Sequence, residues 1–510
     1  MTTERRWLPL LCVFLVVAGA LAIRLVRLGD TSLDFDEYLH VFAGQRLLQH
    51  GRPLLPSGEP YTRALPYTRM VSQSIRWFGT SEAAVRLPSV VCGVGLVLLA
   101  GWIAWRWAGA GAAIVVMVLV ALDPYCLQMS RVCRMYAPFH LLYLGVLYAA
   151  YEAFEGGGSL RRRFGWGAAA LVALAASMKL HKLTVDLVAG VAGYVVVQAT
   201  LTRQRKYWGL TVLGVAAGLA AAALGIVNLV GLWREANWAP AYAAPWRYDY
   251  GFYLRHFRAV DPWMVALAVP ALIWWLWRDA KRGWYLACAI GVPFALHSLI
   301  FDWKEDRYLL HIVPVALLVI GAALWGWSEV LARTLARRRE PDGQRPARRL
   351  TPWVAVLLLA PFGLRAMSGR SLSGLDGTVA KWREAYQTLR PLIRSGDGLV
   401  ISVPLVSAYY LGRLPDYVVL NALVHDAGRD AVAGPDGFLL DWYSGRPLVT
   451  NAEEMERAFH RHTRGWIVID RERFVAETCV PAAVRALIRS RCREWPMPDA
   501  SVVVYSWGVG

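Results

Sequence analysis

Long apolar runs separated by short polar connections fill the first 366 residues of the chain. A helix of about 20 apolar residues spans the roughly 30 Å hydrocarbon core of a bilayer. Only helices or closed barrels satisfy every backbone amide there, and the Ala-, Leu-, Val- and Gly-rich runs are too long for barrel strands. The pattern predicts about eleven membrane-spanning helices, at residues 7–23, 83–105, 110–128, 136–154, 166–180, 183–201, 209–232, 263–277, 284–301, 308–327 and 351–366.

The pattern changes after residue 366. Short runs rich in β-branched residues predict buried strands, and the segments between them have helical periodicity. We therefore expect two domains, an all-α polytopic membrane domain over 1–366 and a small extracytoplasmic α/β domain with a mostly parallel sheet over 367–510. The strand runs are DGLVISVPL (397–405), DYVVL (416–420) and GWIVID (465–470), and the helical ones are KWREAYQTLRPLI (381–393) and VPAAVRALIRSRC (480–492).

Composition supports a membrane protein and charge gives it an orientation. The 510 residues are 56% hydrophobic, and the formal net charge is +18. A basic soluble protein would suggest nucleic-acid binding. Here the arginines cluster in short connections that fall on one side of the predicted bilayer, which the positive-inside rule explains without nucleic acid. We expect a multi-pass inner-membrane protein with a cytoplasmic N-terminus, and an external first loop (24–82) and C-terminal domain.

The first apolar segment could be mistaken for a secretory signal peptide. No small-residue cleavage site precedes Arg24, and many further spans follow, so we interpret it as a retained anchor. Cys479 and Cys492 bracket a predicted helix in the outer domain, where an oxidising compartment permits a disulfide. Cys126 and Cys133 could pair as well. The sequence leaves both pairings open, and no cysteines have zinc-finger spacing.

An acidic cluster follows the first span, in SLDFDEYLHVFAGQRLL (32–48). Its apolar positions predict an interfacial amphipathic juxtamembrane helix. On that helix Asp36 and Glu37 lie four and three residues before His40, so acid and imidazole share a face. Such groups can accept a proton or hold a divalent cation (Mg²⁺, Mn²⁺ or Zn²⁺), with His40 and Glu37 as ligands. Helix capping by Asp34 and Asp36 explains one acid but not the cluster.

Three further motifs occur near the predicted outer face. They are RLPS (86–89), SRVCRMYA (130–137) and DRYLLHIVP (306–314). Together with the acidic pair, in this order, they resemble the GT-C glycosyltransferases, which include protein O-mannosyltransferases, lipid A aminoarabinose transferases and lipopolysaccharide galacturonic acid transferases. The resemblance covers about residues 7–330. It implies the GT-C architecture and transfer of a monosaccharide from a polyprenyl-phosphate donor to a lipid, glycan or protein acceptor.

The resemblance also implies roles for individual residues. Asp36 is the candidate catalytic base for the acceptor hydroxyl, and Glu37 supports it or a metal ion. The leaving group is a lipid phosphate, whose growing negative charge needs cations. Arg63, Arg134 and Arg307 are the candidates for binding the donor phosphate, because a guanidinium matches phosphate geometry.

The chain departs from the family pattern at several positions. Val132 replaces a Glu of the second motif, and Asp123 is the candidate to take over its contact with acceptor or sugar. His311 replaces a Pro of the last motif. In the loop WREANWAPAYAAPWRYDYGFYLRHF (233–257), Trp238 and Tyr248 are candidate sugar contacts, although an aromatic interfacial belt explains them equally well.

Structural roles compete with functional ones for several charged residues. Arg86 could neutralise a neighbour, and Arg307 could pair with Glu305 or Asp302. Asp186, slightly inside a predicted span, is costly to bury and therefore suggests a function.

Two other functions fit the chain less well. A lipid or sugar transporter or flippase would place ionisable residues within spans and show paired internal repeats, whereas these charges gather at the outer surface. An envelope assembly scaffold would use the outer domain for docking.

Overall fold

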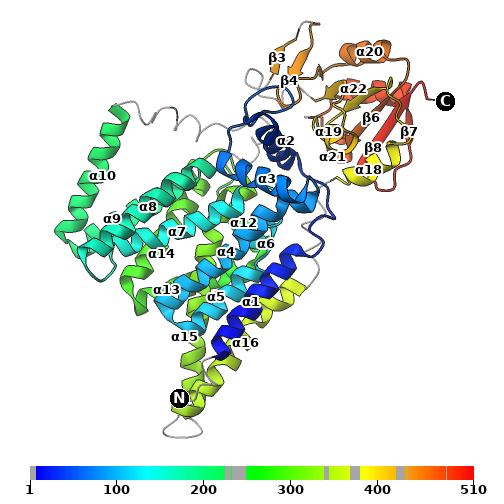
Figure 1. The fold of residues 1–510 in the computed structure, drawn as a ribbon. Coiled ribbons are helices and arrows are strands. Elements are labelled where there is room, and N and C mark those ends of the chain that lie inside the picture. The colour runs from blue at the N-terminus through cyan, green and yellow to red at the C-terminus, as the bar shows by residue number, and fades with distance from the viewer. Residues whose placement is uncertain are drawn as a thin grey trace.

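The structure, a computed structural model, describes residues 7–223, 231, 248–337, 344–367, 380–420, 431–434, 436–477 and 479–509. A long bundle of helices carries a compact sheet domain at one end (Figure 1). The described helices of the first part are α1 (Trp7–Leu25), α2 (Phe35–His50), α3 (Leu65–Phe78), α4 (Glu82–Ala108), α5 (Ala110–Leu122), α6 (Pro124–Met129), α7 (Tyr136–Phe154), α8 (Leu160–Leu180), α9 (Thr184–Thr202), α10 (Arg205–Ala223), α12 (Phe252–Val260), α13 (Pro262–Arg278), α14 (Ala280–Ala295), η3 (Leu296–Ile300), η4 (Asp306–Ile312), α15 (Val313–Arg337) and α16 (Gln344–Met367).

Each predicted spanning segment coincides with helix over the described residues. In the part of the chain that the structure describes, four helical stretches are long and apolar enough to cross a membrane, and a fifth arises if α12 and α13, bent by 111°, form one span. The four are Glu82–Ala108, Thr184–Thr202, Ala280–Ile300 and Asp306–Ala336. The chain is therefore a multi-pass membrane protein, while the number of eleven spans stays a prediction.

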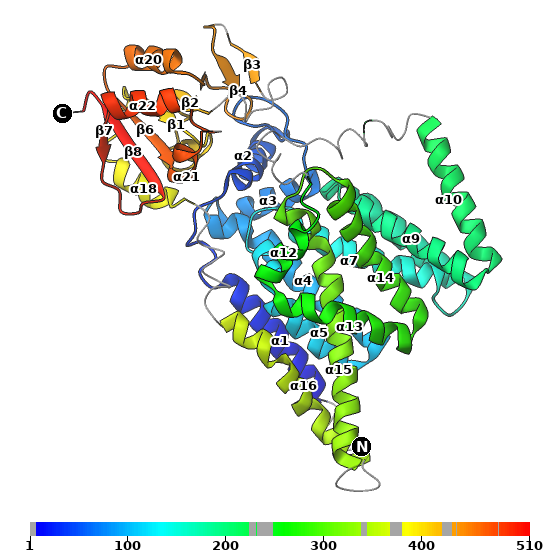
Figure 2. The same ribbon diagram turned by 180° about the vertical axis from the view of Figure 1, so that it is seen from behind.

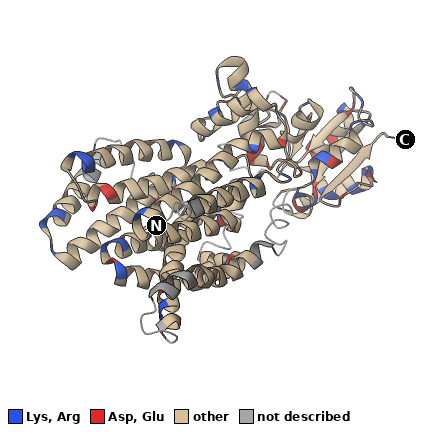
Figure 3. Cartoon of the chain, turned by 60° about the horizontal axis from the view of Figure 1, so that its bottom comes forward, with Lys and Arg blue, Asp and Glu red and all other residues tan. Residues whose placement is uncertain are grey.

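Connections that the charge pattern assigns to the cytoplasm lie on the side of the bundle far from the sheet domain (Figure 2). Glu155, at the end of α7, pairs with Lys206 of α10 at 3.2 Å and Lys281 of α14 at 2.8 Å. The hydroxyl of Tyr207 donates to the same carboxylate at 2.7 Å. Figure 3 shows Lys and Arg gathered at the ends of the bundle, with the flanks of the helices largely free of charge. The alternation of connections along the chain is thus consistent with the folded bundle.

The C-terminal part is an α/β domain, as predicted, but its sheet is mixed. Six described strands form it in the order β5-β2-β1-β6-β8-β7, with parallel pairs from β5 to β6 and antiparallel pairs from β6 to β7. The strands are β1 (Gly398–Ile401), β2 (Tyr417–Val419), β5 (Leu448–Val449), β6 (Gly465–Asp470), β7 (Arg493–Trp495) and β8 (Val502–Trp507), and a separate hairpin pairs β3 (Ala431–Ala433) with β4 (Leu439–Asp441).

Helices cover both faces of this sheet. Side chains from α20 (Ala452–Arg461), α21 (Arg471–Val475) and α22 (Ala482–Arg491) fill one apolar core, which includes Ile467 and Tyr505. On the other face, α18 (Trp382–Leu389) and α19 (Val406–Leu411) join a core that continues into the helical bundle. The two parts of the protein therefore share apolar packing.

The candidate disulfides are not present in the structure. Cys492 packs beside the core that contains Ile467, whereas Cys479 packs beside Val418 and Leu448 on the opposite face of the sheet. The sheet separates these two sulfur atoms. Cys126 and Cys133 are both buried and are not joined either.

The predicted juxtamembrane helix is present as α2, but its surroundings differ from the expectation. Residues 37–41 are all buried, so the helix is covered on several sides instead of lying with one face open. It packs on α3, a helix that the sequence analysis did not predict. The ring of Tyr38 also contacts Tyr409 of α19, with ring centroids 5.5 Å apart. α2 is therefore enclosed between the bundle and the C-terminal domain.

Candidate active site

Asp36 is the meeting point of residues from three distant segments. It lies in the first turn of α2, and its side chain is 26% exposed. Its Oδ2 atom forms an ion pair with Nη1 of Arg134, from the connection before α7, and lies 3.4 Å from Nη1 of Arg307 on η4. The structure thus brings together one predicted base and two predicted phosphate ligands. A partly exposed carboxylate between two guanidiniums can exchange its partners when an anion arrives.

Polar and aromatic groups surround this cluster. Glu305 forms an ion pair with Nε of Arg307 at 2.5 Å, which is the pairing that the sequence left open. Burial raises the pKa of Glu305, although Arg307 opposes the shift. The guanidinium of Arg134 lies 5.4 Å from the ring centroid of Tyr136, within cation–π range. Both arginines are therefore held on more than one side.

His181 adds a neutral group near the arginines. It lies in the turn between α8 and α9 and stacks on Phe139, with centroids 5.1 Å apart. Burial, followed by His311, Arg134 and Arg307, lowers the pKa of His181 to about 3. At neutral pH this imidazole adds no positive charge, so the arginines supply the cations of the site.

Glu37 faces away from Asp36 into a buried ion pair. Its two oxygens accept Nε and Nη2 of Arg86, each at 2.9 Å, and the side chains are 2% and 3% exposed. The amide N–H groups of Asp34 and Cys133 donate to the same carboxylate. With four donors, Glu37 fastens the start of α2 to α4 and to the connection before α7. Arg86 therefore neutralises Glu37, which is the structural role that the sequence left open for this arginine.

The proposed metal ligands do not fit a metal ion. The two oxygens of the Glu37 carboxylate already accept four N–H donors, so neither oxygen is open to a cation. His40 is buried, with Nδ1 at 3.0 Å from Thr68 Oγ1 and its ring between Tyr61 and Tyr67. Over the described residues, no group of three or more His, Cys, Asp or Glu could hold a metal ion.

The remaining predicted site residues are scattered. Arg63 is exposed in the segment before α3. Asp123 is buried and caps α6, because its Oδ1 accepts the amide N–H of Cys126 at 2.7 Å. This cap explains its position without an acceptor contact. Tyr248 is 70% exposed before α12, and Trp238 lies outside the described residues.

A buried acid–imidazole cluster lies within the bundle, where the sequence identified only its acid. Oδ2 of Asp186 lies 2.9 Å from Nε2 of His297 on η3 and 3.1 Å from Nε2 of His311 on η4. All three side chains are at most 2% exposed. The replacement of the family's Pro by His311 was the signal for this contact, because a buried imidazole requires a polar partner.

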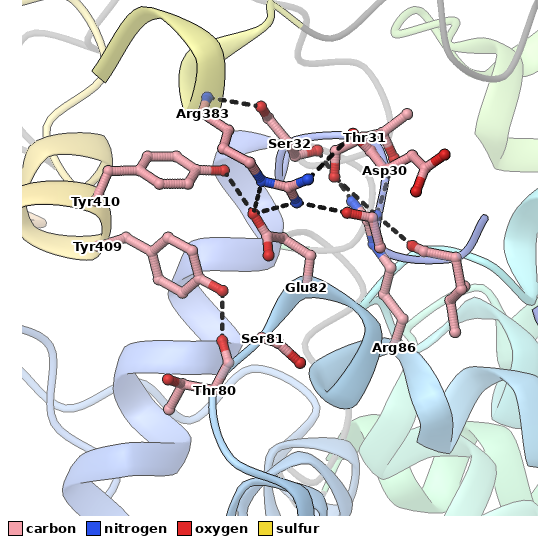
Figure 4. Close-up of polar contacts among 12 residues, drawn as sticks. Asp30, Thr31, Ser32, Thr80, Ser81, Glu82, Arg86, Arg383, Tyr409 and Tyr410 are labelled. Atoms are coloured by element: carbon pink, nitrogen blue, oxygen red, sulfur yellow. Dashed lines mark hydrogen bonds and ion pairs between the residues drawn. The ribbon is translucent and has the colours of Figure 1, made fainter. Parts of the chain in front are cut away.

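The sequence analysis also did not predict a cavity at the junction with the C-terminal domain. A cavity of about 540 Å³ opens between α2 and the C-terminal domain, with Gln45, Glu82, Arg383, Arg390 and Tyr409 among its lining residues. Beside it, Glu82 and Arg383 form an ion pair across the two parts of the protein (Figure 4). No motif links these residues, which are about 300 positions apart in the chain.

Comparisons with known proteins establish the fold. No protein-family model matches the chain, and no curated protein sequence matches it. Among solved structures, ArnT from Cupriavidus metallidurans in the apo state aligns over 99% of this chain and 98% of its own, with a TM-score of 0.64 and 15% identity. The same protein bound to undecaprenyl phosphate aligns over 98% of each chain, with a TM-score of 0.64 and 16% identity.

A second solved relative comes from the archaea. The oligosaccharyltransferase AglB from Archaeoglobus fulgidus, in complex with an inhibitory peptide and a dolichol-phosphate, aligns over 98% of this chain and 74% of its own. Its TM-score is 0.61 and its identity 12%. ArnT and AglB are both GT-C glycosyltransferases, so this chain has the GT-C fold that its motifs predicted.

Proposed function

We propose that the chain is a glycosyltransferase that moves a monosaccharide from a polyprenyl-phosphate donor to a lipid, glycan or protein acceptor at the outer face of the inner membrane. The observation that carries the proposal is the convergence of Asp36, Arg134 and Arg307 on one point of a GT-C fold. The solved relatives with this fold are described with undecaprenyl phosphate and dolichol-phosphate bound, which supports a lipid-phosphate donor.

Asp36 serves as the general base in this proposal. The acceptor hydroxyl attacks the anomeric carbon of the sugar, the bond between that carbon and the phosphate oxygen breaks, and Asp36 takes the hydroxyl proton. The products are the glycosylated acceptor and the free polyprenyl phosphate. A single displacement of this kind inverts the anomeric configuration. A positioned carboxylate contributes about 10²- to 10⁴-fold to such a step.

The two arginines bind the phosphate and so control the base. Arg134 and Arg307 are paired with the Asp36 carboxylate in the structure. A donor phosphate offers them an alternative anion, and its binding releases the carboxylate for proton transfer. As the leaving phosphate gains charge, the same guanidiniums stabilise it. Arg63, exposed before α3, is a further candidate for the phosphate.

Replacing Asp36 by Asn tests the proposal. With purified protein in vesicles that contain an extract of polyprenyl-phosphate sugars, we expect D36N to lower sugar transfer by at least about 100-fold. Asp34→Asn is the matched control, because Asp34 is exposed and Asn caps a helix as well as Asp does. Transfer by D36N at the wild-type rate would remove Asp36 from the chemistry. Movement of labelled lipid across the vesicle membrane, with no product formed, would instead support the flippase hypothesis.

A further inference from the structure

The loop between α1 and α2 is held by two arginines from opposite sides (Figure 4). Arg86, on α4, donates to the carbonyl oxygens of Leu28 at 2.9 Å, Thr31 at 3.1 Å and Ser32 at 3.0 Å. Three carbonyl groups of this loop thus share one buried guanidinium as their donor. Such carbonyl groups need partners when they leave solvent, and Arg86 supplies them from the bundle side.

The second arginine comes from the C-terminal domain. Arg383 lies near the start of α18, and its guanidinium donates to the carbonyl oxygens of Gly29 and Asp30. Its backbone N–H also donates to Oγ of Ser32 at 3.1 Å. One domain therefore bonds directly to the loop that leads into the acidic helix of the other.

Arg383 is itself fixed to the bundle. Oε1 of Glu82 accepts a hydrogen bond from Nε of Arg383 at 3.0 Å and another from the hydroxyl of Tyr410 at 3.1 Å. Glu82 begins α4, one helical turn before Arg86, so both arginines are anchored to the same end of α4. The hydroxyl of Tyr409 donates to the carbonyl of Thr80 just before this helix. The loop is thus clamped between Arg86 and Arg383, which are both attached to the first turns of α4.

The clamped loop ends next to the proposed base. Ser32 is two residues before Asp34, the N-cap of α2, and four residues before Asp36. A shift of the loop would carry the first turn of α2 with it and change the distance from Asp36 to Arg134 and Arg307. Displacements of about 1 Å at a reacting group can cost about 100-fold in rate.

We propose that Arg383, supplied by the C-terminal domain, is a positioning residue for Asp36. This inference rests on the proposed function for its catalytic consequence, but not for the contact itself. The C-terminal domain is then a working part of the transferase, since it sets the geometry of the catalytic helix without touching the substrate.

The test combines hydrogen exchange with kinetics on the full chain. In Arg383→Gln, the amides of residues 28–37 should exchange at least about tenfold faster, because charge-assisted hydrogen bonds to the loop are lost. The turnover number should fall about tenfold or more, while KM for the polyprenyl-phosphate donor stays constant, since Arg134 and Arg307 remain. Arg383→Lys retains a cation for Glu82 and should give an intermediate effect on both readouts.

Arg390→Gln is the matched control. Arg390 lines the same cavity and follows α18, but its side chain makes no hydrogen bond or ion pair with the described residues. This variant should leave exchange and turnover at wild-type values. The inference is overturned if Arg383→Gln leaves exchange in 28–37 unchanged, if it speeds exchange without slowing turnover, or if Arg390→Gln does the same. If the wild-type chain transfers no sugar at all, the proposed function fails, whereas faster exchange still confirms the contact.

Discussion

A single residue step separates two acids with different environments. Asp36 is partly exposed between two arginines, while Glu37 is buried in a complete set of four donors. Adjacent helical positions point about 100° apart, which is why the same acidic run can supply the proposed base and a structural ion pair. The sequence assigned both acids to the chemistry, because spacing alone does not reveal which carboxylate a distant arginine will meet.

The buried pair should be important for stability. In Arg86→Gln the Glu37 carboxylate stays buried without its cation, and we expect a loss of about 3–5 kcal/mol in the free energy of unfolding. Thermal unfolding of the purified protein in detergent measures the change. Arg27→Gln is the control, because the Arg27–Asp30 pair is 73% and 51% exposed and should contribute at most about 1 kcal/mol. Equal midpoints for the two variants would contradict the assignment.

His40 gives a prediction for pH. Burial lowers the pKa of His40 to about 3, well below the ordinary value of about 6.5. Between these values the unfolded chain binds a proton that the folded chain does not, so stability falls as pH decreases from about 6.5 towards 3. The loss is about 1.4 kcal/mol per pH unit.

Replacing this one imidazole isolates its contribution. Between pH 7 and pH 5, the unfolding midpoint of His40→Gln should fall less steeply than that of the wild type. His50→Gln, at an exposed position of the same helix, should keep the wild-type slope. Parallel curves for wild type and His40→Gln would show that His40 titrates normally in the folded protein.

Each candidate residue could be predicted from its own motif, but the contacts among these residues could not. Asp36, Arg134 and Arg307 each stood in a short motif, and the order of those motifs indicated a common face. Their contacts join positions 36, 134 and 307, a separation that only the packing of several helices decides. Arg383 had no motif at all, since its role depends on where the C-terminal domain docks.

At the scale of elements, apolar periodicity predicted most helices and missed α3. That helix begins with Leu65-Pro66 and contains several Ser, Thr and Gln residues, which resemble a loop in composition. Its exposed Trp77 and Phe78, at 69% and 61%, continue an apolar stripe that is visible only once the helix is drawn. The same limit applies to the sheet, because run composition does not distinguish the parallel β1 and β6 from the antiparallel β8.

The short elements η3 and η4 depend on Asp186 for their position. Its carboxylate holds His297 of η3 and His311 of η4, and Arg307 lies one turn before His311. In Asp186→Asn both contacts lose their charged acceptor, and we expect the affinity for polyprenyl phosphate to fall about tenfold. Native mass spectrometry with the lipid measures this. Asp306→Asn, exposed on η4, is the control, and an unchanged affinity in Asp186→Asn would separate the cluster from Arg307.

At the scale of the molecule, charge alternation and the folded bundle agree. Two of the basic connections, those with Lys206 and Lys281, meet at Glu155, whereas the connections that carry Asp36, Arg134 and Arg307 meet at the opposite end, beside the C-terminal domain. The fold thus separates the two sets of connections that the sequence placed on different sides of the membrane. Which set faces the cytoplasm is predicted by the positive-inside rule, which concerns insertion and not packing.

Orientation therefore gives the last prediction, and the proposed donor chemistry depends on it. Glu453→Cys on α20 and Gly157→Cys between α7 and α8 both place a thiol at an exposed position. With a membrane-impermeant maleimide on spheroplasts, Glu453→Cys should be labelled at once and Gly157→Cys only after permeabilisation, with the unchanged chain reporting the native cysteines. The reverse pattern would place Asp36 on the cytoplasmic side. Nucleotide-linked sugars would then be as accessible as polyprenyl-linked ones, and transfer at the outer face would be excluded.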